Sequence, residues 1–333
     1  MHMSDALLSP AVGGALWAAT ACVGARSARV VGRDPDDRRV PLMGVLGAFV
    51  FAAQMVNFGI PGTGSSGHLG GGILLAILLG PHAAFLVMAS VLAIQALFFA
   101  DGGLLALGCN VFNLAFLPCF VAYPLVYRPS AGASPGRGRA LAGAVAASVA
   151  GLALGAAGVV VETQLSGVTS LPFGPFALLV VPVHLAIGLV EGVVTGSVVL
   201  VLWRARPELA AASRGGGAPR AILAAVAAAA LVTAGLLSAF ASERPDGLEW
   251  SVARVAGENA PPPPEGGVHA LLRRVQRASA FLPDYGFARR DPQGLDRRSP
   301  ALAGTSLSGL VGSALTLAAS VLAGAGIRRW RRR

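Results

Sequence analysis

Residues 176–203, FALLVVPVHLAIGLVEGVVTGSVVLVLW, form a long apolar run in which Glu191 is the only charged side chain. About 20 such residues are enough for a helix to cross the hydrocarbon core of a bilayer. The rest of the chain follows the same pattern, because 54% of its 333 residues are hydrophobic and only 13% are charged. A soluble protein has about 25% charged residues. The sequence therefore predicts an all-α polytopic membrane protein.

Nine segments are predicted to span the membrane. In chain order they are residues 11–27, 41–57, 69–80, 82–100, 104–127, 138–162, 176–203, 220–241 and 304–327. The third and fourth are either short or joined, and a break between them is predicted at Pro81, because proline cannot continue the hydrogen bonding of a helix.

Clusters of arginine predict the orientation of these spans. Arginines gather after the first, fifth, seventh and ninth spans, and such clusters favour the cytoplasmic side. All four clusters can lie in the cytoplasm only if the chain crosses the membrane an even number of times between successive clusters, and the nine predicted spans meet this condition. The prediction is a multi-pass protein of the plasma membrane whose N-terminus is extracytoplasmic and whose C-terminus is cytoplasmic.

A change in composition divides the chain. Residues 1–205 are predicted to form a seven-helix bundle, residues 206–219 a cytoplasmic linker rich in Gly, Ala and Arg, and residues 220–333 a two-helix module. Residues 242–303 of that module are predicted to be an extracytoplasmic loop, because a loop of this length can cross the membrane despite its charge.

The basic composition excludes some functions. The net charge is +10, and all the basic side chains except histidine are arginines. A phosphate-binding P-loop needs a lysine, so the chain is not expected to be an ATPase. Arginine clusters in a membrane protein are first a signal of topology, so nucleic acid is not an expected partner and the lipid bilayer is.

The start of the chain predicts a metal site. A free amine on Met1, the amide nitrogen of His2 and the His2 imidazole can close two fused chelate rings on one ion, and His68 is the candidate fourth nitrogen donor. Four nitrogens near one plane suit Ni(II) or Cu(II), and Co(II) is also compatible. The metal would be bound as cargo, and the residues predict no resident cofactor. Affinity should fall in acid, because the ligands must lose protons.

Several stretches resemble one family in the right order. Residues 1–10, MHMSDALLSP, resemble the N-terminal signature of the nickel/cobalt substrate-binding subunits of energy-coupling factor transporters. Residues 65–71, SSGHLGG, resemble the metal-binding loop of that family, and residues 95–104, QALFFADGGL, with 107–113, LGCNVFN, resemble its next two blocks. The resemblance covers about residues 1–205. Ala6 departs from the usual glycine.

The resemblance implies a function and a set of ligands. It implies an importer subunit that captures Ni(II) or Co(II) outside the cell through Met1, His2 and His68, with no catalytic residues of its own. The expected partners are a transmembrane coupling subunit and separate ATPase subunits. Polar residues in or near the spans are candidates to orient the ligands: Gln54, Asn57, Asp101, Asn110 and His184.

A second match lies in the C-terminal module. Pro245, Asp246, Gly247, Leu248 and Glu249 spell PDGLE and resemble a module that is found beside or fused to these subunits, in the place of their small N component. The resemblance implies that this module lies next to the metal site and helps to load it.

Two alternatives remain open at this point. Residues 64–71, GSSGHLGG, fit the pattern of rhomboid-like intramembrane serine proteases, with Ser66 as nucleophile and His184 as its base. A subunit that binds an organic vitamin is the other alternative, but the outer loops offer few aromatic side chains to stack on a ring.

Overall fold

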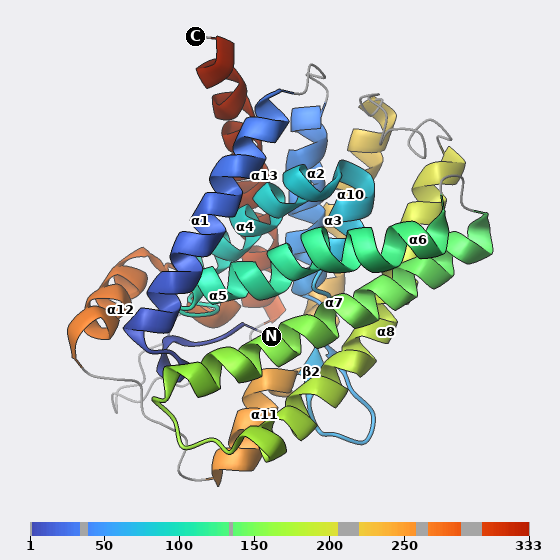
Figure 1. Ribbon diagram of the computed structural model, residues 1–333. Coiled ribbons are helices and arrows are strands. Elements are labelled where there is room, and N and C mark those ends of the chain that lie inside the picture. The colour runs from blue at the N-terminus through green and yellow to red at the C-terminus, as the bar shows by residue number, and fades with distance from the viewer. Residues whose placement is uncertain are drawn as a thin grey trace.

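The computed structural model describes residues 2–33, 39–132, 136–205, 220–257, 266–287 and 302–332. The described part is helical apart from one short ladder (Figure 1). The N-terminal elements are η1 (Asp5–Leu7), α1 (Pro10–Gly32), α2 (Arg39–Gln54), β1 (Phe58–Gly59), β2 (Ser66–Gly67), α3 (Gly72–Leu79) and α4 (Pro81–Phe98). The next are α5 (Leu107–Val111), the π-helix η2 (Phe112–Tyr127), α6 (Arg128–Ala131), α7 (Arg137–Ser166) and α8 (Phe173–Ala205). The C-terminal elements are α10 (Arg220–Gly235), η4 (Leu237–Phe240), α11 (Gly247–Ala256), α12 (Gly267–Ser279), η6 (Pro283–Tyr285) and α13 (Leu302–Arg332).

Six of the described helical segments are long and apolar enough to cross a membrane. They are Pro81–Phe98, Leu107–Ala131, Arg137–Ser166, Phe173–Arg204, Arg220–Phe240 and Gly304–Arg329. The prediction of a multi-pass helical membrane protein is therefore confirmed, and six of the nine predicted spans are among these segments.

The other three predicted spans behave differently. α1 has 23 residues but carries Arg26 and Arg29 in its second half, and α2 is apolar with 16 residues. α3 has only eight residues, or about 12 Å of helix, so the prediction that residues 69–80 cross by themselves was wrong. The chain does break before Pro81, where Gly80 adopts a φ of 77°.

Glycines let α7 and α8 pack closely. A Cβ atom added at Gly192 would lie 2.3 Å from Val145 Cα, and one added at Gly188 would lie 2.7 Å from Val149 Cα. Small residues four apart allow helix backbones to approach in a membrane, where close packing drives association. This pairing fixes α8, which carries His184 and Glu191, against the rest of the bundle.

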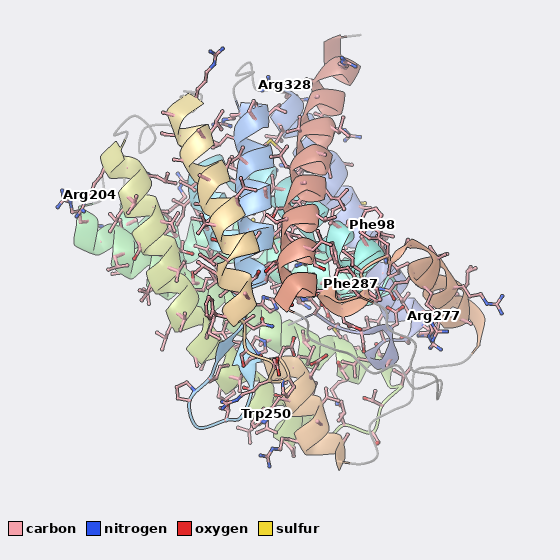
Figure 2. All side chains as sticks on the ribbon, turned by 180° about the vertical axis from the view of Figure 1, so that it is seen from behind. Phe98, Arg204, Trp250, Arg277, Phe287 and Arg328 are labelled. Atoms are coloured by element: carbon pink, nitrogen blue, oxygen red, sulfur yellow. The ribbon has the colours of Figure 1, made fainter. Side chains whose placement is uncertain are left out.

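The C-terminal module packs along the bundle. α10 and α13 both contact α2, and they lie beside it in Figure 1. Arg204 and Arg328 lie toward one end of the molecule in Figure 2, whereas Trp250 of α11 lies at the other end. The start of the described chain and the loop between α2 and α3 lie near α11, toward the end opposite Arg204 and Arg328, whereas Arg277 of α12 lies in the same half of the molecule as Trp250.

Candidate metal centre

The segment after His2 is held by side chains of a distant loop and helix. The Met3 amide donates to Asn110 Oδ1 (2.8 Å), and Asn110 Nδ2 donates to the Met3 carbonyl (3.2 Å). The Gly103 amide donates to the same carbonyl (2.9 Å), and Asp5 Oδ1 accepts from the Ala106 amide (2.9 Å). These bonds fix the backbone next to His2. Asn110, predicted as an orienting residue, thus contacts the main chain of the residue after His2, and its orienting role stays a prediction.

His68 follows a short hairpin. β1 and β2 pair antiparallel with Phe58 opposite Gly67. Beyond His68, the amides of Gly70 and Gly71 donate to the Glu191 carboxylate on α8, at 2.6 and 3.2 Å. Gln54 Nε2 donates to the Gly70 carbonyl (2.8 Å). The loop that carries His68 is therefore fastened to both α2 and α8.

The two predicted histidine ligands meet. Their rings stack with centroids 5.1 Å apart and planes 12° apart. His2 Nδ1 lies 3.2 Å from Asp101 Oδ1, and 5% of the His2 side chain is exposed. His68 Nδ1 lies 3.0 Å from its neighbour's carbonyl, Leu69 O. Because a carbonyl can only accept, this contact requires the proton of a neutral His68 ring to lie on Nδ1.

Met1, the other predicted ligand, lies outside the described residues. Among the residues that the structure describes, no group of three or more His, Cys, Asp or Glu side chains is arranged to hold an ion. That result is compatible with the predicted donors, because two of them are main-chain nitrogens and only two are imidazoles. The role of these residues as ligands stays a prediction.

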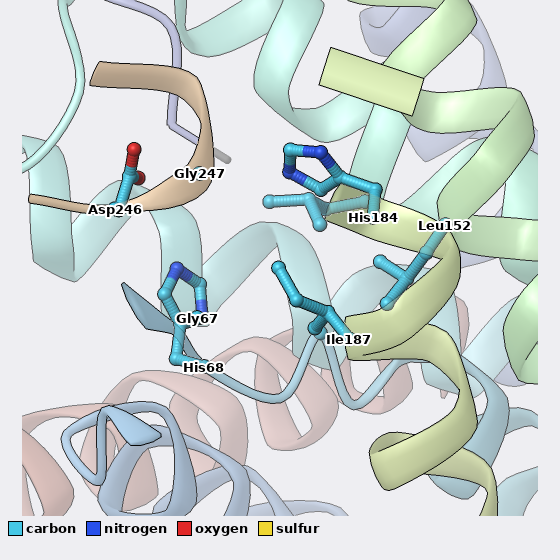
Figure 3. A pocket seen from close by; sticks show the side chains of 9 residues that line it. Gly67, His68, Leu152, His184, Ile187, Asp246 and Gly247 are labelled. Atoms are coloured by element: carbon cyan, nitrogen blue, oxygen red, sulfur yellow. The ribbon is translucent and has the colours of Figure 1, made fainter. Parts of the chain in front are cut away.

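A small cavity adjoins His68. Its volume is about 10 Å³, about the room for one water molecule. It is lined by Gly67, His68, Gly70, Leu114, Leu152, His184, Ile187, Asp246 and Gly247. Figure 3 shows that His184 and Ile187 face it from α8, whereas Asp246 comes from the C-terminal module. His184 Nδ1 contacts the Val180 carbonyl at 2.7 Å, which leaves Nε2 without a proton.

The PDGLE turn closes this side of the site. Asp246 caps α11 by accepting from the amides of Leu248 and Glu249, both at 2.8 Å. The Ser66 amide donates to the Pro245 carbonyl (2.8 Å), so the turn pairs with β2. A Cβ atom at Gly247 would lie 2.5 Å from Val183 Cγ1, so a larger residue there would force the Val183 side chain of α8 to move.

The remaining predicted orienting residues have different placements. Asp101 contacts His2, Gln54 holds the loop of His68, and His184 lines the cavity. Asn57 Oδ1 is buried without a hydrogen-bond partner among the described residues, while the Asn57 carbonyl accepts from the Ser242 amide (2.8 Å). Asn57 thus joins the two parts of the chain.

The fold brings three further residues here. Sequence reasoning singles out Glu191 only as an ionisable group inside a span, which makes it a functional candidate, and it assigns no role to Gln95 or Tyr285. Tyr285 donates its hydroxyl to Asp101 Oδ2 (2.5 Å), Gln95 donates to Gln54 Oε1 (2.8 Å), and Glu191 holds the loop. Gln95 stood inside a recognised sequence block, but Tyr285 lies in the long polar loop and had no signal. Ala100 and Tyr285 have φ values of 55° and 60°, a conformation that costs a non-glycine residue free energy.

The geometry does not support the protease alternative. The Ser66 hydroxyl donates to the carbonyls of Arg244 (2.7 Å) and Pro245 (3.3 Å). A serine nucleophile would instead donate to its base. His184 Nδ1 is engaged with Val180 O within its own helix, and the described contacts do not join it to Ser66.

Comparison with known proteins agrees with this arrangement. Residues 2–209 match the model of the family described as cobalt uptake substrate-specific transmembrane region, and residues 220–329 match the PDGLE domain. The chain belongs to this cobalt-uptake family. It is a nickel/cobalt transport component fused to a PDGLE domain, as the sequence blocks and the PDGLE turn predicted.

Relatives share this fused organisation. The chain is 35% identical to a putative fused nickel transport protein of Archaeoglobus fulgidus, with 96% of each chain covered. It is 35% identical to the fused nickel transport protein of Rhodobacter capsulatus, with 98% of this chain and 96% of the relative covered. A crystal structure of a truncated transition metal transporter, also 35% identical, superimposes with a TM-score of 0.54 over 62% of this chain and 99% of that one.

Stability of this transport component should fall in acid because of the buried histidines. Burial, aided by the amino-terminal charge, lowers the pKa of His2 from 6.5 to about 3. Between these values the unfolded chain binds a proton that the folded chain does not, so the free energy of unfolding decreases as the pH falls. The melting temperature of the metal-free protein in detergent should be lower at about pH 5 than at about pH 7. His2→Ala should reduce this difference; an unchanged difference would contradict the assignment.

Proposed function

We propose that this protein is the substrate-capturing subunit of an energy-coupling factor importer for Ni(II) or Co(II). The observation that supports it most strongly is the stacking of the His2 ring, whose side chain is 5% exposed, on the half-buried His68 ring, which shares a cavity with Asp246 of the PDGLE turn. A coupling subunit and ATPase subunits encoded elsewhere would supply the energy. The chain itself carries out no catalysis in this proposal.

The ligand set is four nitrogens: the Met1 amine, the His2 amide, the His2 imidazole and the His68 imidazole. Their number and type suit a metal with a planar preference. The surrounding bonds support it, because Asn110 and Glu191 hold the segments on which the two histidines stand. Preorganised ligands pay less ordering entropy when the ion binds.

The proposed orientation puts the metal site outside the cell. Arg204 at the end of α8 and Arg328 near the end of α13 lie away from the site (Figure 2), and arginine clusters such as those that follow these two spans favour the cytoplasm. Arg277 of α12 lies in the other half of the molecule, in the loop that is predicted to be extracytoplasmic. Residues 1–205 would form the capturing body, residues 206–219 a cytoplasmic linker and residues 220–333 the fused module. The contacts of Ser66 with the PDGLE turn and of Asp101 with Tyr285 support a module that covers the site.

The choice between nickel and cobalt follows from planarity. Four nitrogen donors in a plane favour Ni(II) over Co(II), and they disfavour Zn(II), which prefers tetrahedral geometry. A relative that is 35% identical over 79% of this chain is described as a cobalt transport protein, in Geobacter sulfurreducens. We propose that both ions bind and that nickel binds more tightly.

Metal content with two forms of the N-terminus tests this proposal. Purified protein beginning at Met1 should retain about one Ni(II) or Co(II) per chain and little Zn(II). A form with one alanine added before Met1 should lose Ni(II) binding, because the chelating amine becomes an amide. The two forms should melt at the same temperature without metal. Equal Ni(II) affinity in both forms would refute the terminal-amine site.

A further inference from the structure

The helix α12 is amphipathic, but it turns its apolar face away from the protein. Val268, Leu271 and Val275 recur at helical spacing along one face, and 45%, 61% and 46% of these residues are exposed. The apolar face of a surface helix normally packs against the core. This face instead needs another apolar environment, which the described part of the chain does not provide.

Polar side chains attach α12 to the bundle from a different face. His269 Nε2 donates to the Leu8 carbonyl (2.8 Å). Two turns later, Gln276 Nε2 donates to the carbonyls of Ala96 and Gly102 (2.9 and 2.7 Å). These hydrogen bonds fix which side of the helix meets the bundle. The exposure of the apolar face therefore belongs to the fold and does not come from a loosely attached helix.

The same hydrogen bonds define the depth of α12. Leu8 lies two residues before α1 begins at Pro10, and Ala96 lies in the last turn of α4, which ends at Phe98. α4 is long and apolar enough to cross a membrane, and the ends of such a segment lie near the membrane surface. α12 also lies at the edge of the molecule, beside the bundle, in Figure 1 and Figure 2. It is thus placed at the membrane surface, on the outside of the bundle.

Arginines occupy a third side of α12. Arg274 and Arg277 are exposed and lie one turn apart. The preference of arginine for the cytoplasm does not explain them, because Arg277 lies in the half of the molecule opposite Arg204 and Arg328 (Figure 2). Basic residues on the polar face and apolar residues on the other are typical of helices that lie in the plane of the membrane surface. The positive charge of this side complements anionic lipid headgroups.

We propose that α12 lies in the membrane–water interface, with the face of Val268, Leu271 and Val275 among the acyl chains and with Arg274 and Arg277 on the headgroups of anionic phospholipids. The bilayer around the bundle is the occupant of the exposed face. This inference requires a membrane-embedded chain and does not depend on the proposed metal. It gives the fused module an attachment to the membrane in addition to its apolar helices.

This attachment reaches the predicted metal centre. Gln276 of α12 binds the Gly102 carbonyl, and the neighbouring Asp101 contacts His2. Tyr285, in the segment after α12, donates to the same Asp101. The lipid surface thereby supports the part of the module that lies against the segment of Asp101.

Quenching by spin-labelled lipid measures where the apolar face lies. Full-length protein in phospholipid nanodiscs carries a fluorophore at Val275→Cys or, on the basic side, at Arg277→Cys. Cys22→Ser removes the exposed native cysteine, and the other two cysteines are buried. A spin label on the acyl chain should quench position 275 at least about three-fold more than position 277, because an interfacial helix buries its apolar face about 5–10 Å deep. Leu271→Cys is the second labelled position on the apolar face.

Aqueous iodide provides the opposite readout. It should reach the label at position 277 several-fold more readily than the labels at positions 271 and 275. Equal quenching of both sides by iodide and by the lipid would overturn the proposal, because the apolar face would then meet water and be left for a protein partner. The measurement contains no metal, so a failure to bind Ni(II) would contradict the proposed function and leave this test intact.

Selectivity for anionic lipid tests the arginines. With the label at position 275, competition between lipids should give phosphatidylglycerol at least about five-fold higher affinity than phosphatidylcholine, since each basic residue near an anionic surface contributes about that factor. The double variant Arg274→Gln/Arg277→Gln should reduce the ratio to near one. The matched control is Arg254→Gln on α11, whose guanidinium lies 5.6 Å from the centroid of the Trp250 ring, and it should keep the ratio. Equal affinity for the two lipids in protein that retains both arginines would overturn their assignment to headgroups.

Discussion

Replacing His68 by alanine is expected to lower the affinity for Ni(II) by at least about 100-fold. A metal held by four protein ligands gains about 10–16 kcal/mol, or about 3 kcal/mol for each donor, and each 1.4 kcal/mol is a factor of ten in affinity. The bundle should stay folded, because His68 stands in a loop whose main chain is held by Glu191 and Gln54. Isothermal titration of the purified protein with Ni(II) measures the effect.

His82→Ala is the matched control. His82 lies at the start of α4 and contacts Ser27 and Phe120 rather than the site. This variant should bind Ni(II) like wild type. If His68→Ala also bound Ni(II) like wild type, His68 would not be a ligand, and the stacking of its ring on His2 would be packing alone.

Replacing Glu191 by leucine should have the second largest effect. The Glu191 carboxylate accepts from the amides of Gly70 and Gly71 (2.6 and 3.2 Å) in a buried position. Leucine leaves two buried N–H groups unpaired, at about 1–3 kcal/mol each. We expect a lower melting temperature in detergent and a loss of Ni(II) uptake in cells that also contain the partner subunits, because the loop of His68 is no longer fixed.

Two further variants separate this anchor from a general effect on α8. Glu191→Gln keeps one acceptor oxygen but turns an NH₂ group toward the second amide, so its loss of stability should lie between that of wild type and Glu191→Leu. The second variant is Thr195→Val. Thr195 lies one turn beyond Glu191 on α8 and is also buried. It should change neither stability nor uptake by a comparable amount. Wild-type uptake by Glu191→Leu would show that the loop does not need this anchor.

The fused module contributes to the site through several separate contacts. Tyr285 binds Asp101, the PDGLE turn pairs with β2, and Gln276 on α12 donates to the carbonyls of Ala96 and Gly102 (2.9 and 2.7 Å). Tyr285 and Gln276 contact the segment that contains Asp101, whose side chain lies against His2. The PDGLE turn contacts Ser66, two residues before His68. A module placed in this way would stabilise the segments on which the predicted ligands stand.

Local sequence was sufficient for much of the fold. Apolar runs near 20 residues identified the membrane class, and Pro81 marked a real break. The prediction of a separate span at residues 69–80 failed. Periodicity and composition do not distinguish a helix that crosses the membrane from a short helix that ends inside a bundle. α3 ends after eight residues at Gly80, whose positive φ cannot be read from hydropathy.

The predicted site divides in the same way. The sequence by itself determined which groups are candidates for the metal chemistry, since His2, His68 and the PDGLE turn are recognisable from residue type and order. Only the tertiary structure decided what orients them. Glu191 lies 121 residues from Gly70, and Tyr285 lies 184 residues from Asp101. Hydrogen bonds between such distant positions depend on how the helices pack, and a buried polar group shows its role only when its partner is known.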